Sequence, residues 1–224
     1  MYEKFLKRFV DFVLALTALL VLLPFLLPIC VLLLLTGEHE VFYLQKRVGC
    51  KNKDFKVWKF ATMLKDSPNI GAGSITLRDD PRVFPVGKFL RKTKINELPQ
   101  VINVLIGNMS IVGPRPLMEV DFAKFSDDVQ AVVYNTNPGI TGIGSIIFRD
   151  EEKWMSDVDG DPHDFDKKYI APYKGALELW YQENISIWTD VKIIFCTAWV
   201  ILFSESYLPY RIFDGLPEKP DALG

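Results

Sequence analysis

The sequence has little of the two residue types that most often hold zinc or form disulfides. Its 224 residues include only three cysteines and two histidines. The cysteines, Cys30, Cys50 and Cys196, are odd in number, and no Cys-x-x-Cys pair occurs. This composition argues against a zinc site and against a disulfide framework. It indicates a reducing compartment in which all three cysteines are structural.

An excess of positive charge is also absent. Lys and Arg number 26 against 28 Asp and Glu, so the formal net charge is −2. A general nucleic-acid binder needs a basic face, and we therefore expect no nucleic-acid partner. The length is enough for one globular domain of moderate size with its own core. The mean hydropathy of +0.14 is high for a chain with 24% charged residues, and the excess lies near the N-terminus.

The apolar excess is a run over residues 12–35 that carries no charge. Lys4, Lys7 and Arg8 precede this run, and acidic residues follow it. The run is longer than the core of a signal peptide and lacks a small-residue cleavage site. A straight helix of this length would reach roughly 36 Å, enough to cross a bilayer with the basic flank on the cytoplasmic side.

Two prolines leave a second topology open. Pro24 lies in the middle of the run, and Pro28 follows one turn later. Each removes a backbone donor and tends to kink a helix. The half before Pro24 reaches only about 18 Å, so a helix broken there could enter the membrane and leave by the same face. The residues alone favour a kinked spanning helix slightly over this re-entrant form.

The rest of the chain predicts a mostly helical α+β fold. Residues 41–49 and 55–60 are rich in β-formers around a polar turn, which is a hairpin signal, and 65–81 have the composition of a loop. Helices are expected over 98–106 (ending at Gly107), over 119–134, and over 165–183 with an interruption at Pro172. We divide the chain into a membrane helix (1–40), a globular domain (41–205) and a C-terminal tail (206–224) that frays.

Residues 188–203 are strongly apolar but short for a membrane span. Trp188 and Trp199 lie along the segment, and Asp190 and Lys192 lie at one end. This pattern suits a helix that lies on a membrane surface, and burial in the core explains it equally well.

The stretch 94–100, Lys-Ile-Asn-Glu-Leu-Pro-Gln, contains the main candidate site. Asn96 can cap a helix through its side-chain oxygen, and Glu97 and Pro99 both suit a first turn. A functional interpretation stays open beside this structural one. A helix start among cations is a phosphate site, and one carboxylate there could hold Mg²⁺ together with substrate phosphates. The neighbouring cations, which could instead form a solvated basic face, are Arg82, Lys88, Arg91, Lys92, Lys94 and Arg115.

Seven short motifs occur in a specific order between about Lys7 and about Ile194. They are Lys7–Asp11, Gln45–Gly49, 80–82 through 91–93, 97–100, Gly113–Pro116, Pro138–Gly142 and Trp188–Lys192. Together they resemble the monotopic phosphoglycosyl transferases, the bacterial sugar transferases that start polyprenol-linked glycans. Each motif is weak alone, and their joint order makes the resemblance specific.

The resemblance implies a re-entrant helix broken near a proline, which Pro24 matches, and this reverses the preference for a span. It also implies a cytoplasmic globular part that rests on the bacterial inner membrane through amphipathic helices. The implied reaction moves a sugar phosphate from a nucleotide diphosphate sugar to undecaprenyl phosphate, with Mg²⁺, in the synthesis of O-antigen, capsule or glycoprotein glycan.

The site residues that the resemblance implies have three roles. The implied catalytic residues are Glu97 and Asn96, and the implied metal ligand is Glu97. Substrate binding falls to Lys59, Arg91, Arg115 and Arg149. Sugar identity and oligomeric state, whether single chain, homo-oligomer or hetero-oligomer, do not follow from it.

The sequence departs from the family pattern at positions 96 and 97, where the family has an Asp-Glu pair. The family has an Asp that is taken as the nucleophile, whereas this chain has Asn96, and an amide cannot take that covalent role. Ala61, Asn108 and the stretch 145–152 are further departures.

Four interpretations stay open. In the first, Glu97 is the nucleophile or a metal ligand, and in the second, the acceptor phosphate attacks the donor directly. In the third, the chain is a catalytically silent homologue that binds substrate or a partner. In the fourth, Asn96 is an engineered trap. We expect a transferase with altered or impaired chemistry, with a silent membrane-docked subunit as the alternative.

Overall fold

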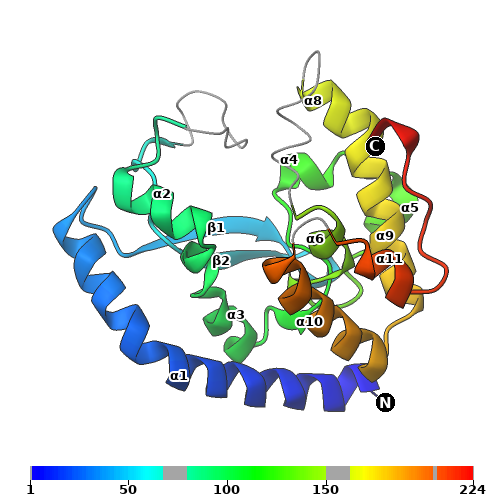
Figure 1. Cartoon of the computed structure of the whole chain (residues 1–224), viewed down its shortest axis with the longest axis horizontal. Helices are drawn as coiled ribbons and strands as arrows, with labels where there is room; N and C mark the ends of the chain where they lie inside the picture. The colour runs from blue at the N-terminus through cyan, green and yellow to red at the C-terminus, as the bar shows by residue number, and fades with distance from the viewer. Residues whose placement is uncertain (1, 68–79, 150–161, 204–205, 224) are drawn as a thin grey trace.

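The computed structural model describes residues 2–67, 80–149, 162–203 and 206–223. Helices dominate it, as expected, and two small sheets lie among them (Figure 1). The expected loop 65–81 and the unusual stretch 145–152 fall partly outside the described residues.

The apolar run forms one long helix, α1 (Lys7–Leu35), after a π-helical turn, Tyr2–Leu6. By length and composition it could cross a membrane. Pro24 and Pro28 both lie inside this helix, which continues through them. The expected interruption of the helix at Pro24 is therefore wrong. The axis instead turns along its length and follows the side of the molecule (Figure 1). A proline removes one hydrogen bond and bends the axis, and apolar packing on both sides of the bend lets the helix continue.

Polar contacts fasten the first turns of α1 to the body. Lys7 forms a buried ion pair with Asp190. Arg8 donates hydrogen bonds to carbonyls at the end of α3 (Gln100–Ile106). The buried carboxylate of Asp11 accepts the backbone N–H of Ile111 at 2.9 Å.

Apolar contacts hold the rest of α1 against the same body. Ala15 packs with Val104 of α3, while Leu26 and Leu33 belong to a buried cluster with Phe60. The helix therefore contacts the body near both of its ends.

The predicted hairpin is confirmed. Strand β1 (Phe42–Val48) pairs antiparallel with β2 (Asp54–Phe60), with Gln45 opposite Val57. Side chains alternate between the two faces of a strand, so Gln45, Arg47 and Lys59 share one face. The helix α2 (Pro85–Lys92) lies near the hairpin (Figure 1).

A second, parallel pair joins β3 (Ser110–Val112) to β4 (Gly139–Thr141) and brings two motifs together. A side chain at position 139 could not fit, because a Cβ on Gly139 would lie 2.1 Å from the backbone nitrogen of Gly113. The helix that was expected over 119–134 is two short helices, α4 (Glu119–Phe122) and α5 (Asp127–Val132), because the chain turns between them.

The other half of the molecule is helical. The chain runs through α6 (Ile143–Ile147), α8 (Pro162–Phe165), a π-helical turn (Asp166–Ile170) and α9 (Ala171–Glu183), then α10 (Ile187–Leu202) and α11 (Leu208–Ile212). Pro172 causes no interruption, because it lies in the first turn of α9, where proline is tolerated.

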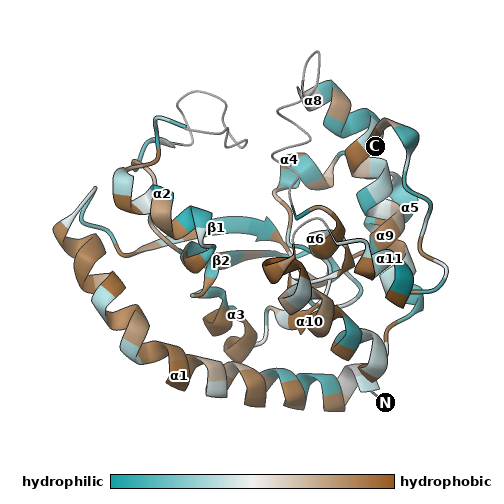
Figure 2. Ribbon diagram, viewed as in Figure 1, coloured by the Kyte–Doolittle hydropathy of each residue, from teal (hydrophilic) through white to brown (hydrophobic). Residues whose placement is uncertain are grey.

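The helix α10 fits both interpretations of its sequence. Ile193, Cys196 and Val200 are buried in the core. Its opposite face is apolar and exposed, with Trp188 at 72% and Leu202 at 75% exposure. Figure 2 shows hydrophobic residues along α1 and α10 on the outside of the molecule.

The C-terminal segment does not fray as expected. Phe213 and Leu223 are buried in the same cluster as α9 and α10, and a short 3-10 turn (Asp221–Leu223) ends the described chain. Apolar contacts offset the entropy of ordering it. All three cysteines are free thiols, and Cys196 is buried.

Candidate active site

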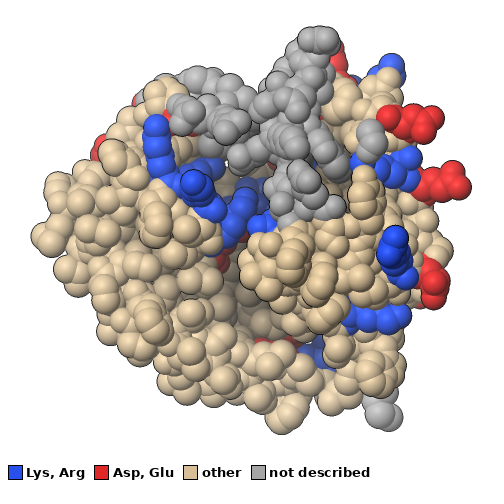
Figure 3. All heavy atoms as spheres, viewed as in Figure 1, with Lys and Arg blue, Asp and Glu red and all other residues tan. Residues whose placement is uncertain are grey.

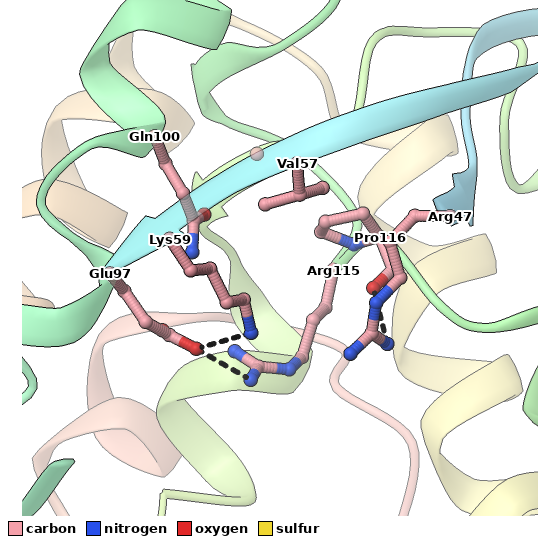
Figure 4. Close-up of a pocket in the computed structure, with 8 residues that line it drawn as sticks. Arg47, Val57, Lys59, Glu97, Gln100, Arg115 and Pro116 are labelled. Carbon is pink, nitrogen blue, oxygen red and sulfur yellow. Dashed lines mark hydrogen bonds and ion pairs between the residues drawn. The ribbon is translucent and has the colours of Figure 1, made fainter. Parts of the chain in front are cut away.

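Four charged side chains from distant parts of the chain line one small pocket (Figure 4). We call Arg47, Lys59, Glu97 and Arg115 the Glu97 cluster. Lys59 Nζ donates a hydrogen bond of 3.0 Å to Glu97 Oε1, and Arg115 Nη2 lies 3.7 Å from the same oxygen. Glu97 is therefore an acceptor shared by two cations.

The hairpin register explains why two of these cations meet. Arg47 on β1 and Lys59 on β2 lie on the same face of the hairpin, so both can point into one pocket. Arg47 is held in place by donating to Pro116 O at 3.3 Å and to Gln45 Oε1 at 2.8 Å.

The loop of Gly113–Pro116 is fixed by hydrogen bonds along its backbone. Tyr134 Oη donates to the Arg115 carbonyl at 2.8 Å and accepts the Leu117 N–H at 2.9 Å. Gly139 N donates to the Pro114 carbonyl at 2.9 Å. Two prolines restrict the remaining torsions. Arg115 thus projects from a stiff backbone.

The cluster carries an excess of positive charge. Burial raises the pKa of Glu97, but Lys59, Arg115 and Lys94 outweigh it and hold that pKa below its usual range. Burial lowers the pKa of Lys59 to about 8, with Arg47 and Arg115 adding to the effect and Glu97 opposing it. Burial and the charge of Arg115 lower the pKa of Arg47 to about 10. Three cations crowd around one carboxylate, which favours the binding of a further anion.

The ion pairs nearly fill the pocket. The cavity between the lining side chains is about 10 Å³, close to the space of one water molecule. Figure 3 shows Lys and Arg side chains gathered beside a hollow on one face of the molecule.

Asn96 lies buried next to the cluster, and its expected role as a helix cap is wrong. The helix α3 begins only at Gln100, with Pro99 at the cap position and no side-chain cap bond. Lys94 has a left-handed backbone (φ 60°), and it leads into a 3-10 turn, Ile95–Glu97, that holds Asn96 away from the helix start. Asn96 Oδ1 has no hydrogen-bond partner among the described residues. Such an orphaned acceptor is costly and fits a place where a donor or cation binds.

Two of the predicted substrate-binding residues do not line the pocket. Arg91 lies in the last turn of α2, where its charge lowers the pKa of Asp80. Arg149 follows α6, and its Nη2 donates to Ile201 O at 3.5 Å. Their predicted roles stay predictions.

Arg47 and Gln100 line the pocket but were not among the predicted site residues. A sequence signal for Arg47 existed, since strand alternation puts it on the face of Lys59. No sequence signal singled out Gln100, because its place depends on where α3 begins.

No group of three or more His, Cys, Asp or Glu side chains that could hold a metal occurs in the described ranges. A metal held by protein groups alone therefore does not fit this part of the chain. Glu97 is the single carboxylate of the cluster, and Asn96 Oδ1 is an unpartnered oxygen beside it. One carboxylate with substrate phosphates is a usual Mg²⁺ site, so this donor set fits Mg²⁺ when a diphosphate is bound.

Comparisons with known proteins identify a family that matches most of the chain. The model of the bacterial sugar transferase family matches residues 2–204. The chain is 36% identical over 200 residues (88% of it, 44% of the relative) to a UDP-N-acetylgalactosamine-undecaprenyl-phosphate N-acetylgalactosaminephosphotransferase of Aeromonas hydrophila. It is 36% identical over 199 residues (88% and 40%) to the UDP-glucose:undecaprenyl-phosphate glucose-1-phosphate transferase of Escherichia coli.

A relative of similar length is the exopolysaccharide production protein PSS of Rhizobium leguminosarum, 36% identical over 198 residues (86% of the chain, 93% of the relative). The chain spans less than half the length of the first two relatives.

Proposed function

This chain belongs to the bacterial sugar transferase family, and we propose that it transfers a sugar 1-phosphate from a UDP-sugar to undecaprenyl phosphate. The relatives whose names state these substrates support the substrate classes. The observation that carries the proposal is the Glu97 cluster, in which three cations surround one carboxylate. Such a cluster suits a diphosphate, whose oxygens can replace the carboxylate.

Binding of the donor is an exchange of partners. Lys59 and Arg115 leave Glu97 for phosphate oxygens, and Arg47 adds a third positive charge. These groups stabilise the negative charge that develops on the departing UMP. Glu97, with its low pKa, stays ionised and would hold Mg²⁺ together with the diphosphate. The bound metal ion supplies charge neutralisation at the phosphates.

The attack on phosphorus comes from the acceptor itself. The amide of Asn96 is not a nucleophile. Glu97 is a weak one, because the cations that hold its pKa low also stabilise its charge. An oxygen of undecaprenyl phosphate therefore attacks the sugar-bearing phosphorus of the donor. The new P–O bond forms as the bond to the UMP oxygen breaks, and UMP leaves with that electron pair.

The helix α1 holds the chain on the membrane as a re-entrant helix. Its first turns pair with Asp190 and its C-terminal half packs on Phe60, so both parts rest on the same globular body. A straight span would carry one end across the bilayer and away from that body. The outer face of α1 is apolar and exposed, which suits lipid. We place both helix ends, and the globular part, at the cytoplasmic face of the bacterial inner membrane.

The test is turnover by the purified protein in lipid nanodiscs with undecaprenyl phosphate and Mg²⁺. UDP-glucose, UDP-galactose and UDP-N-acetylgalactosamine are offered separately, and UMP release is measured. We expect UMP with at least one donor, only when acceptor is present, and no phosphosugar adduct on the protein with donor alone. An adduct on Glu97 would refute direct attack. No UMP from any donor would point to the silent subunit.

A further inference from the structure

A larger cavity lies next to the Glu97 cluster, at the edge of the hairpin. Its volume is about 210 Å³, against about 10 Å³ at the cluster. Arg47 lines both cavities, so one extended ligand can reach from the cluster past Arg47 into the larger cavity. The residues around it come from β1, the start of β2, and α4 with the residue before it: Lys46, Arg47, Asp54, Met118, Glu119 and Val120.

The free edge of β1 faces this cavity. Gly49 N donates to Lys53 O at 2.9 Å, so the residues of β1 at odd positions bond to β2 and those at even positions point their N–H and C=O groups away from it. Val48 N accordingly donates to Leu117 O at 2.9 Å, on the side of residues 117–120. The N–H and C=O of Lys46 point to the same side. Within the described ranges neither group has a hydrogen-bond partner, so both are available to a ligand.

The side chains around the cavity suit an uncharged ring that carries hydroxyl groups. Asp54 and Glu119 bring carboxylates, which accept hydrogen bonds from hydroxyls and repel a further phosphate. Met118 and Val120 add apolar surface against which a flat ring can pack. Gln45 Nε2 donates to the Met118 sulfur at 3.6 Å, which ties this wall of the cavity to β1. A nucleoside has both parts, a ribose with hydroxyls and a flat base.

The order of the charged groups selects the nucleoside end of the donor over its sugar end. Figure 4 shows Glu97 and Arg47 at opposite ends of the cluster, with Arg115 between them. In the proposed reaction the sugar-bearing phosphorus is the one attacked, and it lies toward Glu97. The phosphate of UMP then lies at Arg47, and its nucleoside extends into the larger cavity.

We propose that this cavity binds the uridine of the donor, with the Lys46 backbone pairing with the uracil edge and Glu119 accepting a ribose hydroxyl. The proposal rests on the proposed function, because it assumes a UDP-sugar as the donor. Uracil carries an N–H beside a carbonyl oxygen, and these complement the C=O and N–H of a residue on a free strand edge. The cavity would thus hold the leaving group while the cluster holds the phosphates.

The experiment compares affinity for UDP with affinity for inorganic pyrophosphate, which has the two phosphates and lacks the nucleoside. Both are measured by calorimetry with Mg²⁺ on the full chain in nanodiscs, and wild type should bind UDP at least about tenfold more tightly. Lys46→Pro removes the outward N–H and no bond between the strands, and proline is tolerated at such an edge position. Lys46→Ala keeps the N–H and is the matched control. Lys46→Pro should bind UDP about fivefold more weakly than Lys46→Ala, with equal affinity for pyrophosphate.

A second variant fills the cavity from its exposed side. Val120 is exposed on α4, so Val120→Trp can extend into the cavity without disturbing the core. It should weaken UDP and UMP about tenfold and leave pyrophosphate and glucose 1-phosphate unchanged. A variant that weakens glucose 1-phosphate and spares UMP would place the sugar in the cavity and overturn the proposal.

The remaining outcomes separate this inference from the proposed transfer. Wild type that binds pyrophosphate as tightly as UDP, or Lys46→Pro and Val120→Trp variants that keep the wild-type ratio of the two affinities, would overturn the uridine site and leave the transfer standing. Tight UDP binding without turnover of any UDP-sugar would refute only the transfer. Wild type that binds neither UDP nor any of the three UDP-sugars would overturn both.

Discussion

The carboxylate of Glu97 lies where we propose that the phosphates of the donor bind. Its carboxylate is tied to Lys59 and lies near Arg115 in a pocket of about 10 Å³. In the proposed reaction the donor displaces this carboxylate, so the free energy of these ion pairs is subtracted from the affinity for the donor. Lys59 and Arg115 exchange the carboxylate for phosphate oxygens, so each keeps an anionic partner. The net loss of binding free energy is therefore small compared with the cost of burying the same charges unpaired.

Arg115→Ala should weaken UDP-sugar binding by about 1.5–3 kcal/mol, the range for a charge-assisted hydrogen bond. The loop itself is held by backbone contacts and should keep its conformation, so the loss reports the guanidinium. Calorimetry on the folded variant measures it. Unchanged affinity would remove Arg115 from the site. Lys192→Ala is the comparison, and we expect little effect because Lys192 does not line the pocket and its Nζ bonds Ile212 O.

Asn96→Asp should restore a carboxylate beside Glu97 and strengthen Mg²⁺ binding. The substitution is nearly isosteric, and Lys59 and Arg115 lie close by to favour the charge. Mg²⁺ affinity and a donor-only assay for a phosphosugar adduct should be measured on wild type, Asn96→Asp and Glu97→Gln. An adduct that forms only in Asn96→Asp would identify position 96 as the family's nucleophile position. Inactivity of both wild type and Asn96→Asp with every donor would direct attention to Ala61 and Asn108.

Among the helices and strands, features set by neighbouring residues could be predicted from the sequence. Features set by contacts between distant segments could not. The hairpin and the end of α3 at Gly107 follow from short-range rules, and Gly107 does adopt a positive φ of 93°. The contact of α1 with Phe60 joins segments that are far apart in sequence, so the path of the helix along the body could not be predicted locally. Lys59, Glu97 and Arg115 share one pocket only when β2, the 3-10 turn and the 113–116 loop are assembled, so no local pattern could show that they meet.

The topology of α1 can be tested with single cysteines at the N-terminus and near Glu40. Both should react with a membrane-impermeant reagent only from the cytoplasmic side, because both parts of the helix rest on one body. A Pro24→Ala, Pro28→Ala variant is the comparison, since it restores two backbone donors and should straighten the helix. Labelling of the two positions from opposite sides in wild type would refute the re-entrant placement.

The buried pair of Lys7 and Asp190 should be costly to break singly. Lys7→Met or Asp190→Leu leaves one buried charge alone and should lower stability by about 3–5 kcal/mol, whereas the double variant should lose much less. Thermal unfolding in detergent, with the four proteins of the cycle, measures this coupling. Additive losses would show that the two charges do not depend on each other.

At the scale of the whole molecule, the exposed surface predicts an apolar attachment to the membrane and not an electrostatic one. The chain has a net charge of −2, and exposed apolar side chains lie along α1 and α10, including Leu35 at 73% exposure. Hydrophobic residues run along both helices (Figure 2), which suits contact with lipid.

Binding to vesicles of zwitterionic phosphatidylcholine should therefore survive high salt. At about 1 M salt the Debye length is about 3 Å and surface charge attraction is screened. Cosedimentation at low and high salt checks this, with Phe195→Glu on the exposed face of α10 as a variant that should bind more weakly. Release of the wild-type protein by salt would contradict an apolar attachment.

The ion pair between Lys7 and Asp190 joins residues 183 positions apart. During synthesis at about 5–20 residues per second, Asp190 leaves the ribosome roughly 10–40 seconds after Lys7. Until then Lys7 lacks this partner, whereas the partners of Arg8 and Asp11, at residues 104–111, are made much earlier. In the order of synthesis, the contacts of α1 with α3 and β3 can therefore form first, and the charge of Lys7 is paired only when α10 has been made and docks against it.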